Sequence, residues 1–384
     1  MANVLTDLAA DIYKAADIVG REAVGFIPAV TINAGAEQAA QGDTVRSHFT
    51  REATVNASAT PSMTIPEGDD QTVDTKTMAL SQIASVRIPW TGEDMKHVNN
   101  GSGFETIYGD QIRQAMRGIV NTIEAHVAGV AYKGASRAYG TAGTTPFASN
   151  FNEIAAVRQI LFDNGMPVTD GRLSLVINSA AGTNLRQLAQ LQKANEGGGT
   201  ELLRQGTLLD LQGFMLKESG QVQVHTKGTA TGLDANANLA LKDTTLALDG
   251  GDGGSLLSGD VITFASDSVN KYIVNTGFTA AAGNAVIGGP GIRTAVASGA
   301  ELTIGNNFTA NVALHQSAVE LAMRPLQKPA GGDAAVDEMI VQDPFSGLVF
   351  RISAYKGYNK AMFDITCLYQ AKAWKSDGIA VLLG

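Results

Sequence analysis

The stretch that decides the fold runs from residue 45 to residue 90 and reads VRSHFTREATVNASATPSMTIPEGDDQTVDTKTMALSQIASVRIPW. At its start Val45 and Phe49 alternate with polar residues, and at its end Ile88 and Trp90 do the same. This period of two is typical of β-strands. Between the two ends lies an uncharged middle of small residues. The pattern predicts one long, two-stranded ribbon over residues 45–90.

Such a ribbon is only marginally stable in water by itself, because it has no second layer against which to bury an apolar face. No nearby helical segment is placed to cover this one. A second copy of the chain would supply the missing surface. The ribbon therefore predicts a protein that works by assembly.

A long amphipathic helix is expected to follow the ribbon. Its apolar stripe recurs at steps of three and four, the helical period, through Phe104, Ile107, Tyr108, Ile112, Ala115, Ile119, Ile123, Val127 and Val130. Its other faces carry Glu105, Asp110, Arg113, Arg117 and Glu124. From Gly103 to Lys133 this helix would be about 45 Å long, and Gly134 is a suitable stop. A core helix of a globular enzyme is the alternative interpretation of this segment.

The composition sets limits on function. With 384 residues, 44% of them hydrophobic and 17% charged, the chain has room for two or three domains and a substantial core. A net charge of -9 disfavours tight binding to a phosphate backbone. No stretch approaches a transmembrane helix, and the N-terminus does not resemble a signal peptide. The single Cys367 excludes an intrachain disulfide and a cysteine-based zinc site, so we expect a protein made in a reducing cytoplasm.

The rest of the chain divides by pattern. Residues 3–24 carry a helical stripe with Asp7 and Asp11 on the polar side, which is either a solvated face or a docking surface for a basic partner. A compact α/β region is expected over 150–224, with a helix from 151 to 164, a buried strand at 173–177, and Asn178 or Ser179 capping the next helix.

From 225 to 312 the helical period is absent and glycines separate short β-type runs, which predicts a small, inserted all-β domain. Alternating and helical patterns resume at 313–323. Two strands joined through 356–359 are expected near the end of the chain. The predicted fold class is α+β.

Little in the sequence favours catalysis or metal binding. The five histidines are scattered without metal-ligand spacing, and the Gly-rich and nucleophile-elbow motifs of common enzymes are missing. Cys367 lies in a strand pattern, which favours a buried, inert thiol. The glycine-rich stretch 249–257 resembles one copy of a calcium-binding repeat, but those sites need many copies, so a hairpin turn is the preferred interpretation. No catalytic residue, metal site or cofactor is predicted.

The order of these segments resembles the major capsid proteins of tailed phages, which have the HK97-like fold. More narrowly, it resembles the P22-type coat proteins, in which an extra β-barrel-like domain is inserted into that fold. The stretches that carry the resemblance are SGDVITFASDSVNKYIVN (258–275), ALHQSAVELAMRPL (313–326) and the closing region 343–374. It covers nearly the whole chain, and its motifs are structural rather than chemical.

The resemblance implies a role for each segment. These are an N-terminal arm (1–44), an extended loop across a neighbouring subunit (45–90), a spine helix with the peripheral domain (91–149), a first part of the axial domain (150–224), the inserted β domain (225–312), and closing strands of both domains (313–384). It implies a shell of hexamers and pentamers that encloses a phage's double-stranded DNA. Within the extended loop, Phe49, Met63 and Ile65 are expected to contact the neighbour.

The same resemblance implies partners: a scaffolding protein, a portal protein, and DNA that is contained without specific binding. Asp7, Asp11 and Asp17 are the expected docking residues for a basic scaffolding segment. Assembly would take place in the bacterial cytoplasm, without a membrane, and the product would be the virion capsid. Lys76, the only lysine between 45 and 90, lies away from the loop tip, so no covalent crosslink between subunits is expected.

Two other classes of function remain as alternatives. A binding module for a carbohydrate or protein ligand would use the β domain, whose aromatic residues are Phe264, Tyr272, Phe278 and Phe308. A globular enzyme would need polar residues that converge from several loops, and no pattern marks them.

Overall fold

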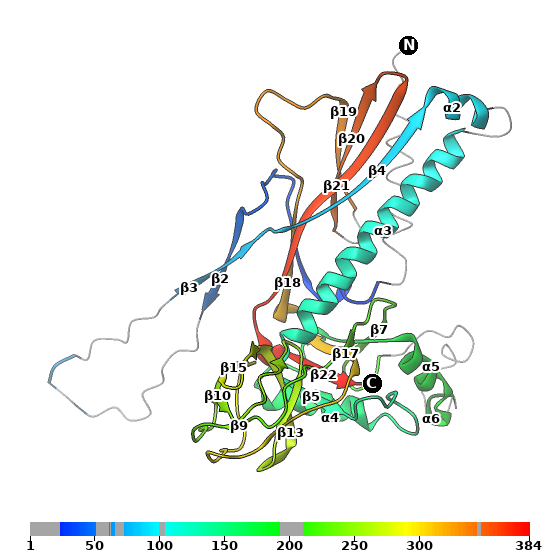
Figure 1. Ribbon diagram of the computed structural model, residues 1–384. Coiled ribbons are helices and arrows are strands. Elements are labelled where there is room, and N and C mark those ends of the chain that lie inside the picture. The colour runs from blue at the N-terminus through cyan, green and yellow to red at the C-terminus, as the bar shows by residue number, and fades with distance from the viewer. Residues whose placement is uncertain are drawn as a thin grey trace.

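The computed structural model describes residues 24–50, 61, 63–65, 73–99, 104–192, 210–343 and 347–384. A long helix connects two β-sheets, and a slender ribbon leaves the body beside the first sheet (Figure 1). The chain thus mixes helices and sheets, as the sequence predicts. Among the described residues, no helix has the length and apolar character needed to cross a membrane.

The long helix α3 (Phe104–Lys133) has 30 residues, or about 45 Å at 1.5 Å per residue. The predicted stripe is the reason it forms here, because Ile112, Ile119 and Val127 are buried against the sheets. Gly134 ends the helix, as predicted, and its N–H donates to the Val130 carbonyl at 3.0 Å. A Cβ at this position would lie 2.4 Å from the Cβ of Ala373, so glycine is required by close packing.

The first sheet has six strands: β1 (Thr31–Ala34), β4 (Gln82–Thr91), β18 (Val319–Arg324), β19 (Ala335–Gln342), β20 (Val349–Gly357) and β21 (Lys360–Ala373). β21 is the longest strand and pairs with β4, β18 and β20. β20 and β21 form the predicted closing hairpin, in which Asn359 adopts a φ of 50°. The short helix α2 (Gly92–Asn99) connects β4 toward α3.

The second sheet has twelve strands. One end of it is formed, in order, by β7 (Met215–Glu218), β6 (Leu173–Ile177), β17 (Phe308–His315), β22 (Ile379–Leu383) and β5 (Arg137–Gly140). Three helices bury a second core on it: α4 (Asn152–Asp163), α5 (Ser179–Gln187) and α6 (Ala189–Gln192). The expected helix at 151–164 and strand at 173–177 are both confirmed, and the Asn178 side chain caps α5 by accepting the Ala181 N–H at 2.9 Å.

Residues 224–304 contain strands and no helix. They are β8 (Val224–His225), β9 (Asp234–Ala235), β10 (Thr245–Asp249), β11 (Ser255–Leu256), β12 (Val261–Phe264), β13 (Asp267–Thr276), β14 (Phe278–Thr279), β15 (Gly283–Ile287) and β16 (Leu302–Ile304). The stretch has a hydrophobic cluster of its own. Its strand β13 pairs with β5, so that the second sheet continues into it.

The expected ribbon over 45–90 is wrong in its second half. β2 (Thr44–Thr50) pairs with β3 (Val73–Ala79), whereas β4 runs on into the six-stranded sheet beside β21. The physical reason is burial, because Ile88 and Trp90 on β4 pack into the main core with α3. The ribbon is therefore shorter than predicted and ends near residue 80.

In the segment at 313–323 the expected alternation is confirmed, and the expected helical part is not an α-helix. The segment continues as strand β17, one 3₁₀ turn η2 (Gln316–Ala318) and strand β18, without an α-helix. The two remaining 3₁₀ turns are η1 (Ile27–Ala29) and η3 (Ser376–Gly378). The helix expected at 3–24 lies outside the described residues, apart from its last position.

Candidate assembly surfaces

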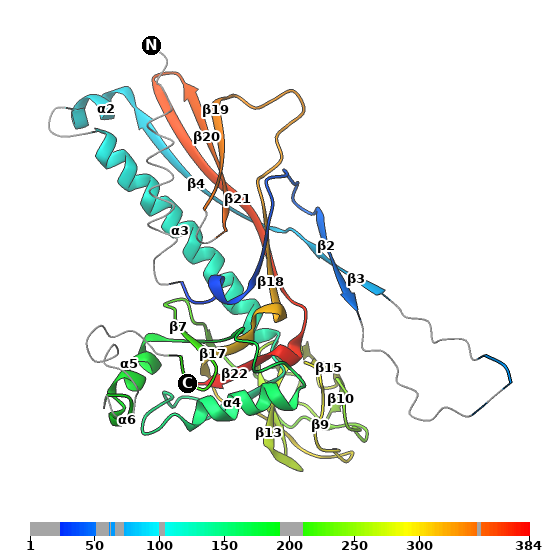
Figure 2. The same ribbon diagram turned by 180° about the vertical axis from the view of Figure 1, so that it is seen from behind.

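The β2–β3 ribbon lies away from both sheets in two opposite views (Figures 1 and 2). Its strands pair in register from Thr44 opposite Ala79 to Thr50 opposite Val73. Two of the predicted contact residues lie beyond these strands, in a described segment where Met63 is fully exposed and Ile65 is 90% exposed.

The third predicted contact residue, Phe49, lies on β2 opposite Asp74, and its side chain is outside the described part. Met63 and Ile65, two positions apart, present two large apolar side chains that this chain does not cover.

The base of the ribbon, in contrast, is fixed to the body. Met78 and Leu80 are buried in a small cluster with Ala322 and Leu368 of the first sheet. The Lys76 ammonium donates to the Trp374 carbonyl at 2.9 Å. Lys76 thus lies at the body end of the ribbon, and the extended segment is held at a defined base.

A buried carboxylate fixes the segment that precedes β1. Glu124, on α3, is 1% exposed and accepts the backbone N–H groups of Gly25 and Phe26 at 2.6 and 2.7 Å. Its second oxygen accepts the Ile27 N–H at 2.9 Å, and its first also accepts the Ser219 hydroxyl at 2.9 Å. The sequence placed Glu124 on a face of the helix other than the apolar stripe, and its burial there was not predicted.

The reason is that four donors replace water around the Glu124 carboxylate, which allows its burial. The ammonium of Lys217 lies nearby and donates to the Pro28 carbonyl at 2.8 Å. Burial lowers the pKa of Lys217, and the charge of Glu124 partly opposes that shift. The predicted docking residues Asp7, Asp11 and Asp17 lie outside the described residues.

An open groove of about 640 Å³ lies between β4 and α3. It is lined by Val86, Arg87, Ile88, Pro89, Asp110, Gln111, Gln114, Ala115 and Gly118. Ile88 and Ala115 are buried, and Arg87 is exposed. No sequence pattern identified this groove, because it depends on β4 lying beside α3 rather than in the ribbon.

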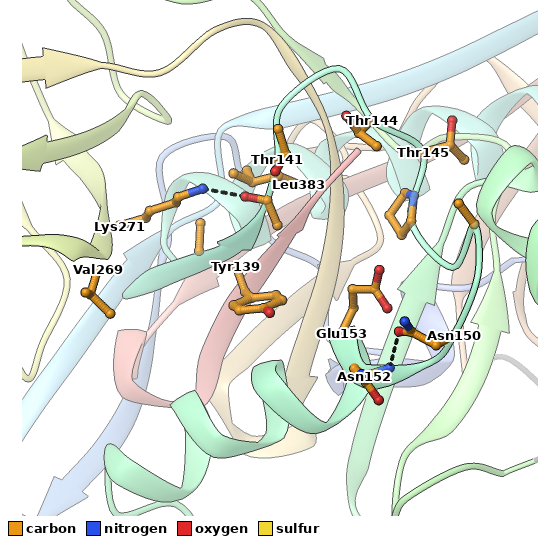
Figure 3. Close-up of a pocket in the computed structure, with 14 residues that line it drawn as sticks. Tyr139, Thr141, Thr144, Thr145, Asn150, Asn152, Glu153, Val269, Lys271 and Leu383 are labelled. Atoms are coloured by element: carbon orange, nitrogen blue, oxygen red, sulfur yellow. Dashed lines mark hydrogen bonds between the residues drawn. The ribbon is translucent and has the colours of Figure 1, made fainter.

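A second cavity, of about 480 Å³, lies where the 140–152 loop and α4 meet β13 (Figure 3). Its lining is mixed: Tyr139, Glu153, Lys271 and several threonines and asparagines lie beside apolar side chains such as Val269 and Leu383. The sequence did not identify it, because its two walls come from segments more than a hundred residues apart.

Two buried histidines have carboxylate partners. His315 Nε2 lies 2.8 Å from Asp170, and its Nδ1 lies 2.8 Å from the Ser317 hydroxyl and accepts the Ser317 N–H at 3.2 Å. Because Nδ1 receives a backbone N–H, this trio caps η2, and the hydrogen bond from His315 lowers the pKa of Asp170.

The other histidine, His225, lies between Asp260 and Tyr132. Because Tyr132 is on α3, these contacts join the β8–β16 stretch to that helix. Desolvation, with the nearby Asp260 charge, raises the pKa of Tyr132 to about 12. In the described part of the chain, no three His, Cys, Asp or Glu side chains gather in a group that could hold a metal ion.

The aromatic residues of the 225–312 region do not form an exposed platform. Phe264 and Tyr272 are buried in the cluster of this region, Phe278 is partly buried against it, and Phe308 is buried in the main core. The turn at 249–257 is held by Asp252, which accepts the Thr231 N–H and hydroxyl at 3.1 and 2.8 Å. These positions are explained by internal packing and turn geometry.

Comparison with known proteins gives structural likeness without sequence relatives. No protein-family model and no curated protein matches the chain. The capsid of Cyanophage P-SCSP1u is similar with a TM-score of 0.48 and 10% identity, over 92% of this chain and 86% of that one. The mature capsid of bacteriophage PhiM1 gives 0.46 and 12%, over 94% and 86%. A structure from Mycobacterium phage Che8 gives 0.47 and 13%, over 89% and 84%.

Proposed function

We propose that this chain is the subunit of an icosahedral phage capsid and that its ribbon binds a neighbouring copy. The observation that carries the proposal is the exposure of Met63 and Ile65 in the segment between β2 and β3, where the base of β3 is packed against the first sheet. Large exposed apolar side chains favour contact with another surface. Burial of each would contribute about 1.5–3 kcal/mol.

The modest strength of one such contact is compatible with assembly of a closed shell. A single ribbon contact would be weak and reversible, which lets misplaced subunits dissociate. Repetition by symmetry adds the contacts of all copies together. The buried Glu124 and the β3 base keep each subunit in one shape while the contacts form.

The groove between β4 and α3 is the acceptor we assign to the ribbon of the next copy. Ile88 and Ala115 give it an apolar interior, and Arg87 and Asp110 give it charged groups at its lining. Met63 and Ile65 match an apolar interior flanked by polar groups, which is the usual anatomy of a protein interface.

The finer assignments follow from the sequence resemblance. We propose the P22-type variant, with residues 225–312 as the inserted β domain, although the strands that pack around their own hydrophobic cluster end near 304. Hexamers and pentamers would enclose double-stranded DNA after assembly in the bacterial cytoplasm. A portal protein would join the shell, and a scaffolding protein would dock on Asp7, Asp11 and Asp17.

The function is tested by sedimentation and negative-stain microscopy of the recombinant chain, with and without the scaffolding protein encoded beside it. Wild-type protein should give closed shells or capsid-like sheets. The double variant Met63→Ser/Ile65→Ser should sediment as free subunits and retain the wild-type circular dichroism spectrum, because neither residue supports the fold.

The matched control is Val224→Ser/Val336→Ser, which removes two other exposed apolar side chains, 70% and 59% exposed. It should assemble. A wild-type chain that remains monomeric under every condition would refute the capsid proposal. Equal loss of assembly in both double variants would refute the specific role of the ribbon.

A further inference from the structure

The cavity between the 140–152 loop and β13 has features that subunit assembly does not require. Its volume of about 480 Å³ lies within the range of small-molecule sites, roughly 300–1,000 Å³. Polar side chains line it from two separate segments, and Val269 at its edge is 87% exposed. A cavity of this size and polarity is able to hold a small hydrophilic ligand.

One wall presents a carboxylate oxygen that lacks a partner. The Oε2 atom of Glu153 is buried and accepts no hydrogen bond from any described residue. A buried acceptor without a donor costs about 1–3 kcal/mol. A ligand hydroxyl or N–H group placed in the cavity would remove this cost.

The opposite wall presents a cation. The Lys271 ammonium reaches across from β13 and donates to the Gly140 carbonyl, and burial lowers the pKa of Lys271. In Figure 3 the Tyr139 ring lies between the side chains of Lys271 and Glu153. Because an ammonium has three donor hydrogens, Lys271 keeps donors for a ligand.

These groups set the chemistry of the ligand. One carboxylate and one ammonium leave the cavity without net formal charge, so that a charged ligand would meet one like charge. A hydroxyl group both donates and accepts, and it can therefore satisfy Glu153 and Lys271 alike. Tyr139, 42% exposed, adds an apolar ring face beside these polar groups.

We propose that this cavity binds a neutral saccharide. Its hydroxyl groups would donate to Glu153 and accept from Lys271, while one face of the sugar ring lies on Tyr139. Hydroxyl and amide groups of Thr141 and Asn152 would complete the polar contacts. The site is separate from the ribbon and the groove, so it stands independently of the capsid proposal.

The test is calorimetric titration of the full-length chain with maltose, lactose and cellobiose, beside glucosamine and glucuronate as charged counterparts. At least one neutral sugar should bind, and more tightly than both charged ones. Glu153→Gln keeps the size of the side chain and replaces one acceptor oxygen with a donor, so it should weaken binding at least tenfold. Tyr139→Leu should do the same by removing the aromatic face.

The control is Tyr358→Leu, which removes an aromatic residue that is 96% exposed on the β20–β21 hairpin, and it should bind as the wild type does. Retention of the chain on dextran-coated beads would identify a surface glycan as the source of the ligand, and binding of free disaccharides alone would identify a soluble sugar. Three results would overturn the proposal: no binding of any neutral sugar, unchanged binding by Glu153→Gln and Tyr139→Leu, or tighter binding of a charged counterpart.

Discussion

The Glu124 carboxylate accepts the backbone N–H of Phe26 at 2.7 Å, across 98 residues of sequence. This bond and those from Gly25 and Ile27 join the segment before β1 to α3, and a fourth bond joins the Ser219 hydroxyl to the same carboxylate. Because α3 and the entering chain share one buried anion, the segment before β1 enters the body at a fixed point.

Glu124→Gln should therefore destabilise the fold strongly. The amide keeps one acceptor oxygen but turns its NH₂ group toward backbone donors, and charge-assisted hydrogen bonds are lost. We expect a loss of about 2–4 kcal/mol in the free energy of unfolding, measured by urea denaturation. Ser219→Ala removes only one donor and should cost about 1 kcal/mol. Equal effects of the two variants would contradict this account.

Gly134→Ala tests the close contact at the end of α3. The new Cβ would lie 2.4 Å from the Cβ of Ala373, so that helix and strand must separate. Overpacking of this kind costs about 1–3 kcal/mol. Gly129→Ala is the matched control within the same helix, because its Cβ meets nothing within 4 Å. It should stabilise by up to about 1 kcal/mol through helix propensity, and a stabilising Gly134→Ala would contradict the packing.

The pair Asp234 and Asp249 predicts a pH dependence. They face each other across β9 and β10, and the hydrogen bond between the two carboxyl groups raises the pKa of Asp249. A raised carboxyl pKa stabilises the fold while the group is protonated, and this contribution is lost as pH rises through the folded-state pKa.

Asp249→Asn keeps a donor for Asp234 at every pH. The melting temperature of this variant should exceed that of the wild type by a margin that grows from pH 4 upward and then levels off. Thermal scans over a pH series measure this margin. A margin that is constant with pH would show that the two carboxyl groups do not share a proton.

Cys367 should be inert in the folded protein. It is fully buried in β21, and desolvation raises its pKa to about 12. At pH 8 the thiolate fraction falls on the order of a thousandfold below that of a free cysteine with a pKa of ~8.5. Alkylation by iodoacetamide should be slow in buffer and rapid in urea. Rapid alkylation of the native chain would mean that β21 opens.

Covalent crosslinking between subunits is not expected. Lys76 is engaged with the Trp374 carbonyl at the base of the ribbon. Assembled particles boiled in detergent should therefore run as single chains on a gel. Covalent multimers in that sample would contradict this prediction.

The helix α3 was predictable because its stripe is long and strongly periodic, and the sequence located both ends to within one residue. The neighbouring strand with which each strand pairs could not be predicted. Alternation at 82–91 shows that β4 is a strand, but it does not show whether β3 or β21 lies beside it. Long-range pairing depends on burial by α3, which a local pattern does not contain.

For the candidate surfaces, too, the sequence does not contain the long-range contacts between distant segments. Met63 and Ile65 were named from the family resemblance as contacts with a neighbouring copy; their side chains are exposed, and the contact itself stays a prediction. The burial of Glu124 was not predicted because its donors come from residues 25–27 and 219, and no local signal connects these to α3. Glu153 and Lys271 line the same cavity only because β13 pairs with β5.

The most direct test of the central claim is a photo-crosslink from the ribbon. A photoreactive amino acid in place of Ile65 would be irradiated in assembled particles, and the adduct mapped by mass spectrometry. We predict a covalent dimer in which residue 65 of one copy is joined to residues 86–89 or 110–118 of another. Adducts confined to a single chain, or joined to a different surface, would contradict the account.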